Sequence, residues 1–284
     1  MLKVETTPHM FGISLYGDYF DLNEIYDSLS RYLDFYQENE VGCSYDDYEY
    51  LLSLNYDIRH AYMGTRGKTR QKDNHGNIYF HVEILYPLVF HYLAAFESIL
   101  DDGYHPDWFE KRQSKCEDDP YLQTYDEITA LHDQSQIRFF VSLLWQNIAS
   151  LFGTEETVSI YHYACCQEYR FVHPIYTDAL LHYSMVHFHT LSDTQKKDFL
   201  KVCLYEELGS EELLDLMEEN TECRSAYSES LASLSKASPA FQTKEQFYQS
   251  FELAFCNKQP IYEDDFEQFL DQVYGTVRTE EPDW

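Results

Sequence analysis

The segment from residue 77 to residue 100, "NIYFHVEILYPLVFHYLAAFESIL", constrains the fold most, because its apolar pattern changes period in the middle. Before residue 86, Ile78, Phe80, Val82 and Ile84 alternate with polar or amphipathic side chains, which is typical of a strand. Pro87 then suits the first turn of a helix, and the residues after it are apolar all round. The segment therefore predicts a strand at 77–85 that leads into a core helix packed on a small sheet.

Two more strands are predicted near the start of the chain, at residues 2–7 and 11–17. "LKVETT" alternates apolar and polar side chains, and "FGISLYG" is rich in strand-forming residues. The Pro8-His9 pair between them predicts a hairpin.

Helical spacing dominates the remaining sequence. A helix is predicted from Asp21, which lies three residues before Glu24 as in a capping box. "YDDYEYLLSLNYDIRHAYM" predicts a second helix, or a helix running into a strand, that ends at Gly64. Residues 136–152 carry one broad apolar stripe. Further capping boxes are predicted at Ser192 with Gln195 and Thr243 with Gln246, and further stops at Gly209 and Gly275.

These elements predict an α+β protein with a small N-terminal antiparallel sheet and a larger, mostly helical C-terminal portion. Charged and turn-forming residues fill the stretch 101–120, which is predicted to be a linker or surface loop. The chain then divides into an α+β unit at 1–100, this linker, and a helical region at 121–284.

The overall charge limits the classes of partner. Fifty acidic residues against 20 basic ones give a formal net charge of -30, while 44% hydrophobic and 17% aromatic residues indicate a folded chain. Such a surface opposes binding to nucleic acid and to anionic membranes, and it favours a basic protein partner. The alternative is that the acidity only keeps the protein in solution.

Cysteine usage and hydropathy predict a cytoplasmic location. The seven cysteines are odd in number and form no C-x-x-C pair, which fits a reducing compartment. The first residues lack the apolar core of a signal peptide, and no stretch approaches the ~18 consecutive apolar residues of a membrane span.

No motif predicts catalysis, a metal or a cofactor. His182, His187 and His189 lie close in sequence, but their spacing matches no zinc motif. "GTRGKT" at 64–69 lacks the spacing of a phosphate-binding loop. Cys165 and Cys166 are predicted to pack rather than to react. We therefore expect a protein without metal or cofactor.

An acidic stretch at residues 205–222 is the candidate surface for the basic partner, because it holds eight acids and no base. Its leucines supply an inner face, so its carboxylates are expected to face solvent. The candidate partner-binding residues are Glu206, Glu207, Glu211, Glu212, Asp215, Glu218 and Glu219.

Positive charge gathers instead in "YDIRHAYMGTRGKTRQKDNHG", residues 56–76, which holds five of the 20 basic residues. Three interpretations stay open: a solvated loop, a self-association contact with the acidic helices of another copy, or a phosphate contact. The candidate residues for self-association or anion contact are Arg59, His60, Arg66, Lys68, Arg70 and Lys72.

The segments "YDIRHAYMG" and "ILYP" carry a resemblance to a known family. Over residues 1–100 the chain resembles a family of uncharacterised bacterial proteins that share an N-terminal strand pair and these two segments. The family has no known activity, so the resemblance implies an N-terminal unit and assigns no catalytic role to Arg59, His60 or Tyr62.

The sequence as a whole predicts a protein-interaction module. Its acidic, tyrosine-rich composition fits an inhibitor or neutraliser of a basic partner such as a nuclease, a toxin or a bacterial defence effector, as a viral anti-defence or immunity-type protein would be. A homo-oligomer is a further possibility. The alternative function is a hydrolase whose histidine and carboxylate residues meet only in the fold.

Overall fold

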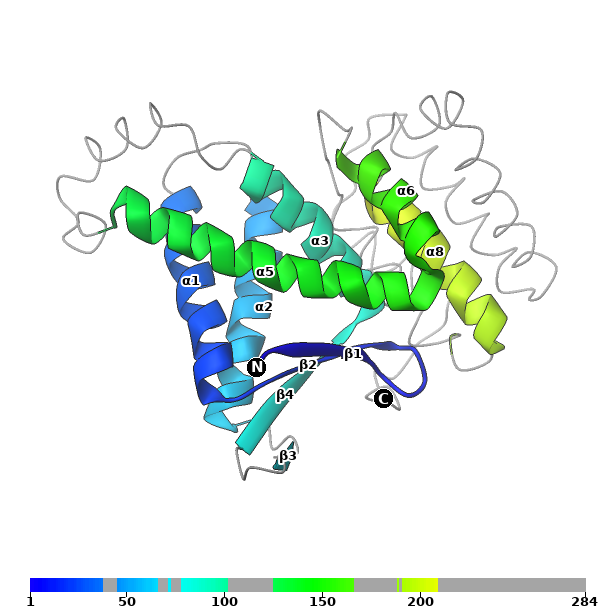
Figure 1. The fold of residues 1–284 in the computed structure, drawn as a ribbon, viewed down its shortest axis with the longest axis horizontal. Helices are drawn as coiled ribbons and strands as arrows, with labels where there is room; N and C mark the ends of the chain where they lie inside the picture. The colour runs from blue at the N-terminus through cyan, green and yellow to red at the C-terminus, as the bar shows by residue number, and fades with distance from the viewer. Residues whose placement is uncertain are drawn as a thin grey trace, which may run out of the picture.

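The computed structural model describes residues 1–37, 45–65, 71–72, 78–101, 125–165, 188 and 191–208. This part of the chain forms a small antiparallel sheet covered by helices (Figure 1). The strands are β1 (Lys3–Thr6), β2 (Gly12–Gly17), β3 (Gln71–Lys72) and β4 (Ile78–Leu85). The helices are α1 (Tyr19–Gln37), α2 (Tyr45–Met63), α3 (Tyr86–Asp101), α5 (Glu127–Phe152), α6 (Thr154–Cys165) and α8 (Asp193–Leu208). The predicted α+β layout is confirmed.

The strand order in the sheet is β1-β2-β4-β3, with every pair antiparallel. The predicted hairpin joins β1 to β2, and the Thr7 N–H donates to the Gly12 carbonyl at 2.9 Å. The Gly12 N–H donates in turn to Thr7 Oγ1 at 3.1 Å. Met10 has a φ of 60° inside this turn. The side-chain bond from Thr7 thus closes the turn where the ladder begins.

β4 passes directly into α3, as the change of period at Pro87 predicts. The Tyr86 N–H still donates to the Phe11 carbonyl at 3.0 Å, so the ladder between β2 and β4 continues into the first residue of the helix. Pro87, which has no N–H to donate, follows at once. The predicted core helix therefore begins directly at the end of β4, and the hydrogen bond from Tyr86 to Phe11 ties its first residue to β2.

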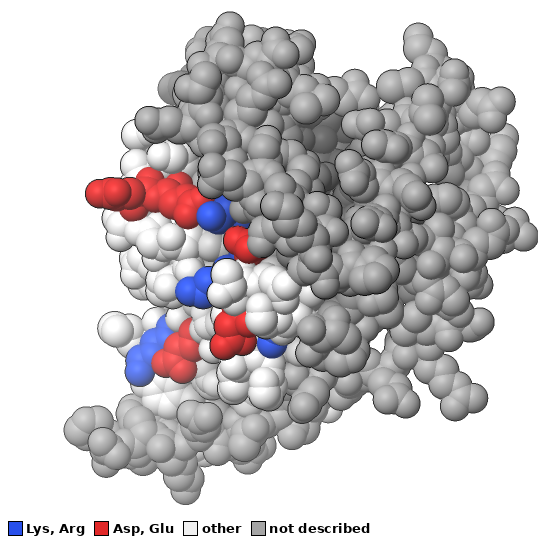
Figure 2. Space-filling model, turned by 90° about the vertical axis from the view of Figure 1, so that its right-hand side faces the viewer, with Lys and Arg blue, Asp and Glu red and all other residues white. Residues whose placement is uncertain are grey.

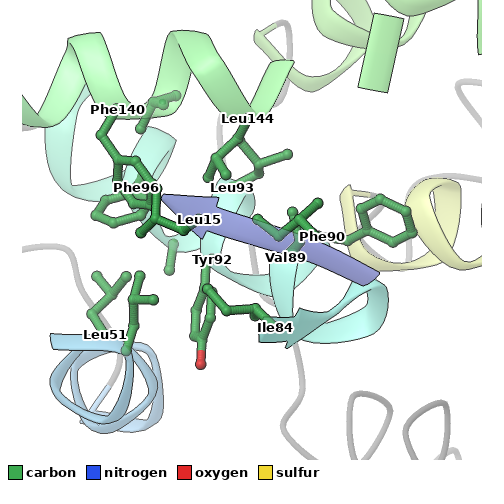
Figure 3. Close-up of a cluster of buried hydrophobic side chains, with 14 of the residues drawn as sticks. Leu15, Leu51, Ile84, Val89, Phe90, Tyr92, Leu93, Phe96, Phe140 and Leu144 are labelled. Carbon is green, nitrogen blue, oxygen red and sulfur yellow. The ribbon is translucent and has the colours of Figure 1, made fainter. Parts of the chain in front are cut away.

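The hydrophobic core lies between the sheet and the helices (Figure 3). Leu15 of β2 and Ile84 of β4 face the buried side chains of α3, which include Phe90 and Phe96. Phe140 of α5 packs edge-on against Phe96, with ring centroids 5.9 Å apart. α3 is thus the central helix, and α1, α2, α5 and α8 pack around the sheet and this helix (Figure 1).

The predicted start of α1 is wrong by three residues. The helix begins at Tyr19, and its capping pair is Asp18 with Asp21: the Asp18 N–H donates to Asp21 Oδ2 at 3.1 Å, and the Asp21 N–H donates to Asp18 Oδ1 at 2.9 Å. An aspartate can accept backbone hydrogen bonds at either end of a capping box. The sequence therefore contains two overlapping boxes, Asp18 with Asp21 and Asp21 with Glu24, and the structure uses the first.

Other predicted helix ends agree with the structure. α2 ends before Gly64, which has a φ of 68°. α8 begins after a reciprocal box in which the Ser192 N–H donates to Gln195 Oε1 at 3.0 Å and the Gln195 N–H donates to Ser192 Oγ at 3.4 Å. Thr243, Gln246, Gly209 and Gly275 lie outside the described residues, as does the predicted linker after Asp101. No described helix is both long and apolar enough to cross a membrane.

A ring of three polar side chains joins the sheet to the helices inside the core. The Tyr86 hydroxyl donates to Asn147 Oδ1 at 2.9 Å, Asn147 Nδ2 donates to Thr6 Oγ1 at 3.1 Å, and Thr6 Oγ1 lies 3.0 Å from the Tyr86 hydroxyl. Because Tyr86 uses its own proton toward Asn147, Thr6 donates to Tyr86 and the ring closes. β1, α3 and α5 are thereby fixed relative to one another.

This ring predicts a loss of stability at high pH. Burial raises the pKa of Tyr86 to about 12 from its ordinary value of 10.0. The phenol loses its proton at lower pH in the unfolded chain than in the folded protein. The free energy of unfolding should therefore decrease as pH rises from about 10 to 12, by about 2 to 3 kcal/mol in total for this residue. Urea unfolding at a series of pH values should show a shallower fall for Tyr86→Phe. Equal slopes in both proteins would contradict the role given to Tyr86.

Candidate interaction surface

An exposed groove lies where the first turn of α1 meets the middle of α5. Its volume is about 290 Å³. Phe20 and Phe139 form apolar walls on the two helices, and the carboxylates of Asp21 and Glu24 belong to the same groove. Met1, Leu2, Ile25 and Gln136 complete the lining. The groove therefore combines aromatic and anionic side chains in one exposed site.

Aromatic side chains continue from this groove along α1 to the end of α2. Tyr19 packs edge-on against Phe20 at 5.5 Å between ring centroids and against Tyr62 at 5.3 Å. Tyr62 also meets Tyr26 at 5.9 Å. We call the exposed rings of the groove and of these ring contacts the aromatic patch, and it consists of Tyr19, Phe20 and Phe139. Phe20 is the most exposed of them, at 79%.

Such a patch has the composition of a protein interface. Aromatic residues, Met and Arg are enriched at interfaces, whereas large apolar side chains exposed together are uncommon on a surface without a partner. Two of its rings, Tyr19 and Phe139, are each about half exposed. Rigid aromatic rings supply a large contact area and lose little side-chain entropy when a partner buries them, so these positions are suited to binding.

Arg59 and His60, two of the predicted contact residues, lie near the end of α2 beside the half-exposed Tyr56. The Arg59 guanidinium carbon lies 4.7 Å from the Tyr56 ring centroid, a cation–π contact. The His60 ring lies 4.2 Å from that of Tyr56, and His60 Nδ1 is 2.5 Å from Thr65 Oγ1. Arg59 Nε and His60 Nε2 have no hydrogen-bond partner among the described residues. Both nitrogens are buried, so they are not presented to a partner at the surface.

The electrostatics of the patch keep Tyr62 neutral. Burial is the main cause that raises the pKa of Tyr62, and Tyr26, Asp27 and Tyr19 raise it further, while Arg59 lowers it. The phenol therefore keeps its proton at neutral pH. The charged groups described around this surface include the carboxylates, Arg59 and the N-terminal ammonium of Met1, which lies 2.6 Å from Asp21 Oδ2.

The remaining predicted sites lie largely outside the described structure. Lys72 belongs to β3 and Glu206 and Glu207 to the end of α8, but the side chains of these three residues are not described. The others, Arg66, Lys68, Arg70, Glu211, Glu212, Asp215, Glu218 and Glu219, lie outside the described residues. On the face that Figure 2 shows, acidic and basic side chains of the described part lie close together.

Two histidines of the described part lie near carboxylates. His132 Nε2 is 3.6 Å from Glu24 Oε1, and its Nδ1 is 3.5 Å from Asp133 Oδ1. His81 Nε2 lies 3.8 Å from Glu83 Oε1. Neither histidine lines the groove. Within the described ranges no three histidine, cysteine, aspartate or glutamate side chains are grouped to hold a metal ion. His182, His187 and His189 lie outside these ranges.

Sequence reasoning missed the residues that make the groove. Phe139 lies beside the buried stripe of α5, which Ile137, Phe140, Val141 and Leu144 form, so its apolar character there was a usable signal. Phe20 lies in the first turn of α1, two residues after Asp18, so no earlier turn of the helix lies beneath its side chain. An apolar residue off the stripe of an amphipathic helix is one that the chain's own core does not use.

Comparison with known proteins identifies a family but no activity. No curated protein and no solved structure shows significant similarity to the chain. A family model described as a domain of unknown function, DUF6904, matches residues 2–246. The match extends well beyond residues 1–100, to which the resemblance of the sequence was limited, and includes the groove and the aromatic patch. The chain belongs to this family, DUF6904.

Proposed function

We propose that this protein is an intracellular interaction module that binds a basic protein partner. The observation that carries the proposal is the groove between α1 and α5, where the exposed ring of Phe20 lies next to the carboxylates of Asp21 and Glu24. The finer part of the proposal is that the protein inhibits or neutralises its partner, a nuclease, a toxin or a bacterial defence effector, and that it is a bacterial or viral protein of the cytoplasm.

The groove suits a lysine or arginine side chain from the partner. Long basic side chains lay their aliphatic stem along apolar surface and keep the charged head among polar groups. Here Phe20 and Phe139 would contact the stem, and Glu24 would pair with the head. Asp21 already pairs with the N-terminal ammonium of Met1, at 2.6 Å from its Oδ2. A guanidinium above an exposed ring gains a further cation–π attraction. The groove therefore supports a basic partner more specifically than net charge does.

The acidic stretch at 206–219 has a different proposed role, which is to steer the partner during encounter. Charges at the rim of an interface change the association rate more than the lifetime of the complex, whereas buried anchors change the dissociation rate. With a net charge of -30, the whole chain attracts a basic protein over a distance limited by salt.

A hydrolase was the alternative expectation, and it gains no support from the described residues. His132 is half exposed, and the Asp133 carboxylate beside it is occupied by Arg31, whose Nε and Nη2 donate to it at 2.9 and 2.6 Å. Arg31 and Asp133 join α1 to α5 and do not line the groove. His132 meets the groove only through Glu24, whose Oε1 lies 3.6 Å from His132 Nε2.

Site-specific crosslinking tests the proposed partner. A photo-crosslinking amino acid at position 20 should capture a basic protein in cells, and Glu24→Lys should suppress the adduct. Position 158 is the matched control, because Val158 is also an exposed apolar residue, on α6. A captured protein that is acidic, or that is captured equally from position 158, would contradict the proposal.

Binding kinetics with the captured protein then separate the two roles. Phe20→Ser should raise Kd roughly 10-fold or more, mainly through faster dissociation, because the anchor is lost. Reversing four or more of the acids at 206–219 to lysine should slow association instead. Inhibition is tested by assaying the partner's own activity with and without an equimolar amount of this protein. If the partner's activity is unchanged, the proposal that this protein binds a partner stands, but the proposal that it inhibits that partner is rejected.

A further inference from the structure

A second cavity lies between β1 and α5, beside the edge of the sheet. Its volume is about 460 Å³. Val4, Glu5 and Thr6 of β1 form one wall, and Leu143, Gln146, Asn147 and Ser150 of α5 form the other. In the described part of the chain, β1 is the terminal strand of the sheet.

The hydrogen-bond phase of β1 shows which of its backbone groups face away from the sheet. Opposite residues of an antiparallel pair alternate between those that exchange backbone hydrogen bonds and those that do not. Thr7 and Gly12 are opposite and bonded, so Glu5 and Lys3 are the next bonded positions. The N–H and C=O groups of Val4 and Thr6 therefore point outward.

The other side of β2 gives an independent check of this phase. The Tyr86 N–H donates to the Phe11 carbonyl, which continues the register between β2 and β4 and makes Ile13 bond toward β4. Ile13 is opposite Thr6 in the register of β1 and β2. Because Ile13 bonds to β4, it does not bond to Thr6, which agrees with an outward-facing Thr6.

The cavity follows this outer edge. Val4 and Thr6 are partly buried while Lys3 and Glu5 are exposed, so side chains of the two sets point to opposite faces of the sheet. A cavity that contacts Glu5 as well as Val4 and Thr6 must run along the edge of the strand, where their backbones meet it. Unpaired backbone groups at such an edge are a template for another strand.

We propose that β1 pairs with β1 of a second copy, antiparallel, about a twofold axis at Val4, so that the two sheets become continuous. In this register Val4 exchanges two backbone bonds with Val4 of the second copy. Lys3 then lies opposite Glu5 of the second copy, and Glu5 opposite its Lys3. The two cross-strand ion pairs on the exposed face make the edge complementary to itself.

The neighbouring registers that keep the outward groups paired are less favourable. A twofold axis at Glu5 brings the two Glu5 carboxylates directly opposite each other, and like charges there are destabilising. An axis at Thr6 pairs Val4 with Pro8 of the second copy, which has no N–H to donate. The axis at Val4 is the register that the sequence of the edge favours.

α5 provides polar groups beside the added strand. Asn147 is held by its bonds to Tyr86 and Thr6 and keeps a second amide N–H, since its Nδ2 makes one bond in the described structure. Gln146 and Ser150 are exposed along the same wall. These groups can bond to the polar side chains or backbone of an incoming strand.

Sedimentation velocity on the full chain, over a range of concentrations, tests the pairing. The wild type is expected to form a dimer of twice the 33.8 kDa chain mass. Val4→Pro should abolish the dimer, because it removes an N–H that the described strands of one copy leave outside the ladder. Circular dichroism should show that this variant keeps its fold.

A charge-swap cycle tests the register and does not depend on the proline variant. Lys3→Glu and Glu5→Lys should each raise the dimer Kd about 10-fold, because each places like charges opposite each other, and the double variant should return Kd to near the wild-type value. Glu127→Lys, on the exposed start of α5, is the charge-matched control and should leave Kd unchanged. A wild type that stays monomeric at roughly 100 µM, or a dimer unaffected by both Val4→Pro and the single swaps, would overturn the proposal.

Discussion

Replacing Gly12 with alanine is expected to destabilise the fold by about 4 kcal/mol or more, which is at the severe end for a single substitution. A Cβ at position 12 would lie 2.0 Å from the Ile84 carbonyl oxygen and 2.9 Å from Leu85 Cα, both of them backbone atoms of β4. Backbone atoms of a paired strand cannot move aside as a side chain can. The variant must therefore separate β2 from β4, the central pair of the sheet.

Gly153 provides the matched control for this substitution. It is the C-cap of α5 with a φ of 95°, and a Cβ there would meet no atom within 4 Å. Gly153→Ala should therefore cost only the backbone strain of an alanine at this φ and a ψ of 153°, a combination that is essentially restricted to glycine, about 1 to 3 kcal/mol. Denaturant unfolding measures both variants. If both variants lose the same amount of unfolding free energy, the close approach of β2 to β4 at Gly12 is not the cause of the destabilisation.

Removing Asp133 is the second change with a large expected effect. Asp133 is fully buried and accepts two hydrogen bonds from Arg31, which joins α1 to α5 across the core. Asp133→Ala leaves the largely buried guanidinium without its partner, and the expected loss is about 3 to 5 kcal/mol. Because the groove is formed by the same two helices, this variant should also weaken partner binding.

A variant that removes the whole polar group tests the reason for that loss. Tyr125 lies beside the ion pair, and burial together with the Asp133 carboxylate raises the pKa of Tyr125, so its hydroxyl is neutral. The triple variant Arg31→Met, Asp133→Leu and Tyr125→Phe leaves no unpaired polar atom of this group, and its stability should return to near that of the wild type. A triple variant as unstable as Asp133→Ala would mean that the ion pair itself, and not the unpaired charge, accounts for the effect. Urea unfolding of both variants distinguishes these outcomes.

The sequence by itself determined the elements that depend on neighbours along the chain. The hairpin around Pro8, the strand that becomes a helix at Pro87 and the box of Ser192 with Gln195 were all predictable, since alternation, a missing N–H and a side-chain cap act within a few residues. The start of α1 shows the limit of such signals, because Asp21 can serve in two overlapping boxes.

Tertiary structure alone decided the surfaces on which the proposed functions rest. Phe20 and Phe139 come from distant parts of the chain, and only the packing of α1 against α5 makes them two walls of one groove. Arg31 and Asp133 gave no sequence signal for the same reason. The outward direction of Val4 follows from the pairing of β1 with β2, not from its own residue type. Local sequence fixes which residues are helical or extended, but contacts between distant residues depend on how the elements bury their apolar faces together, and no single segment contains that information.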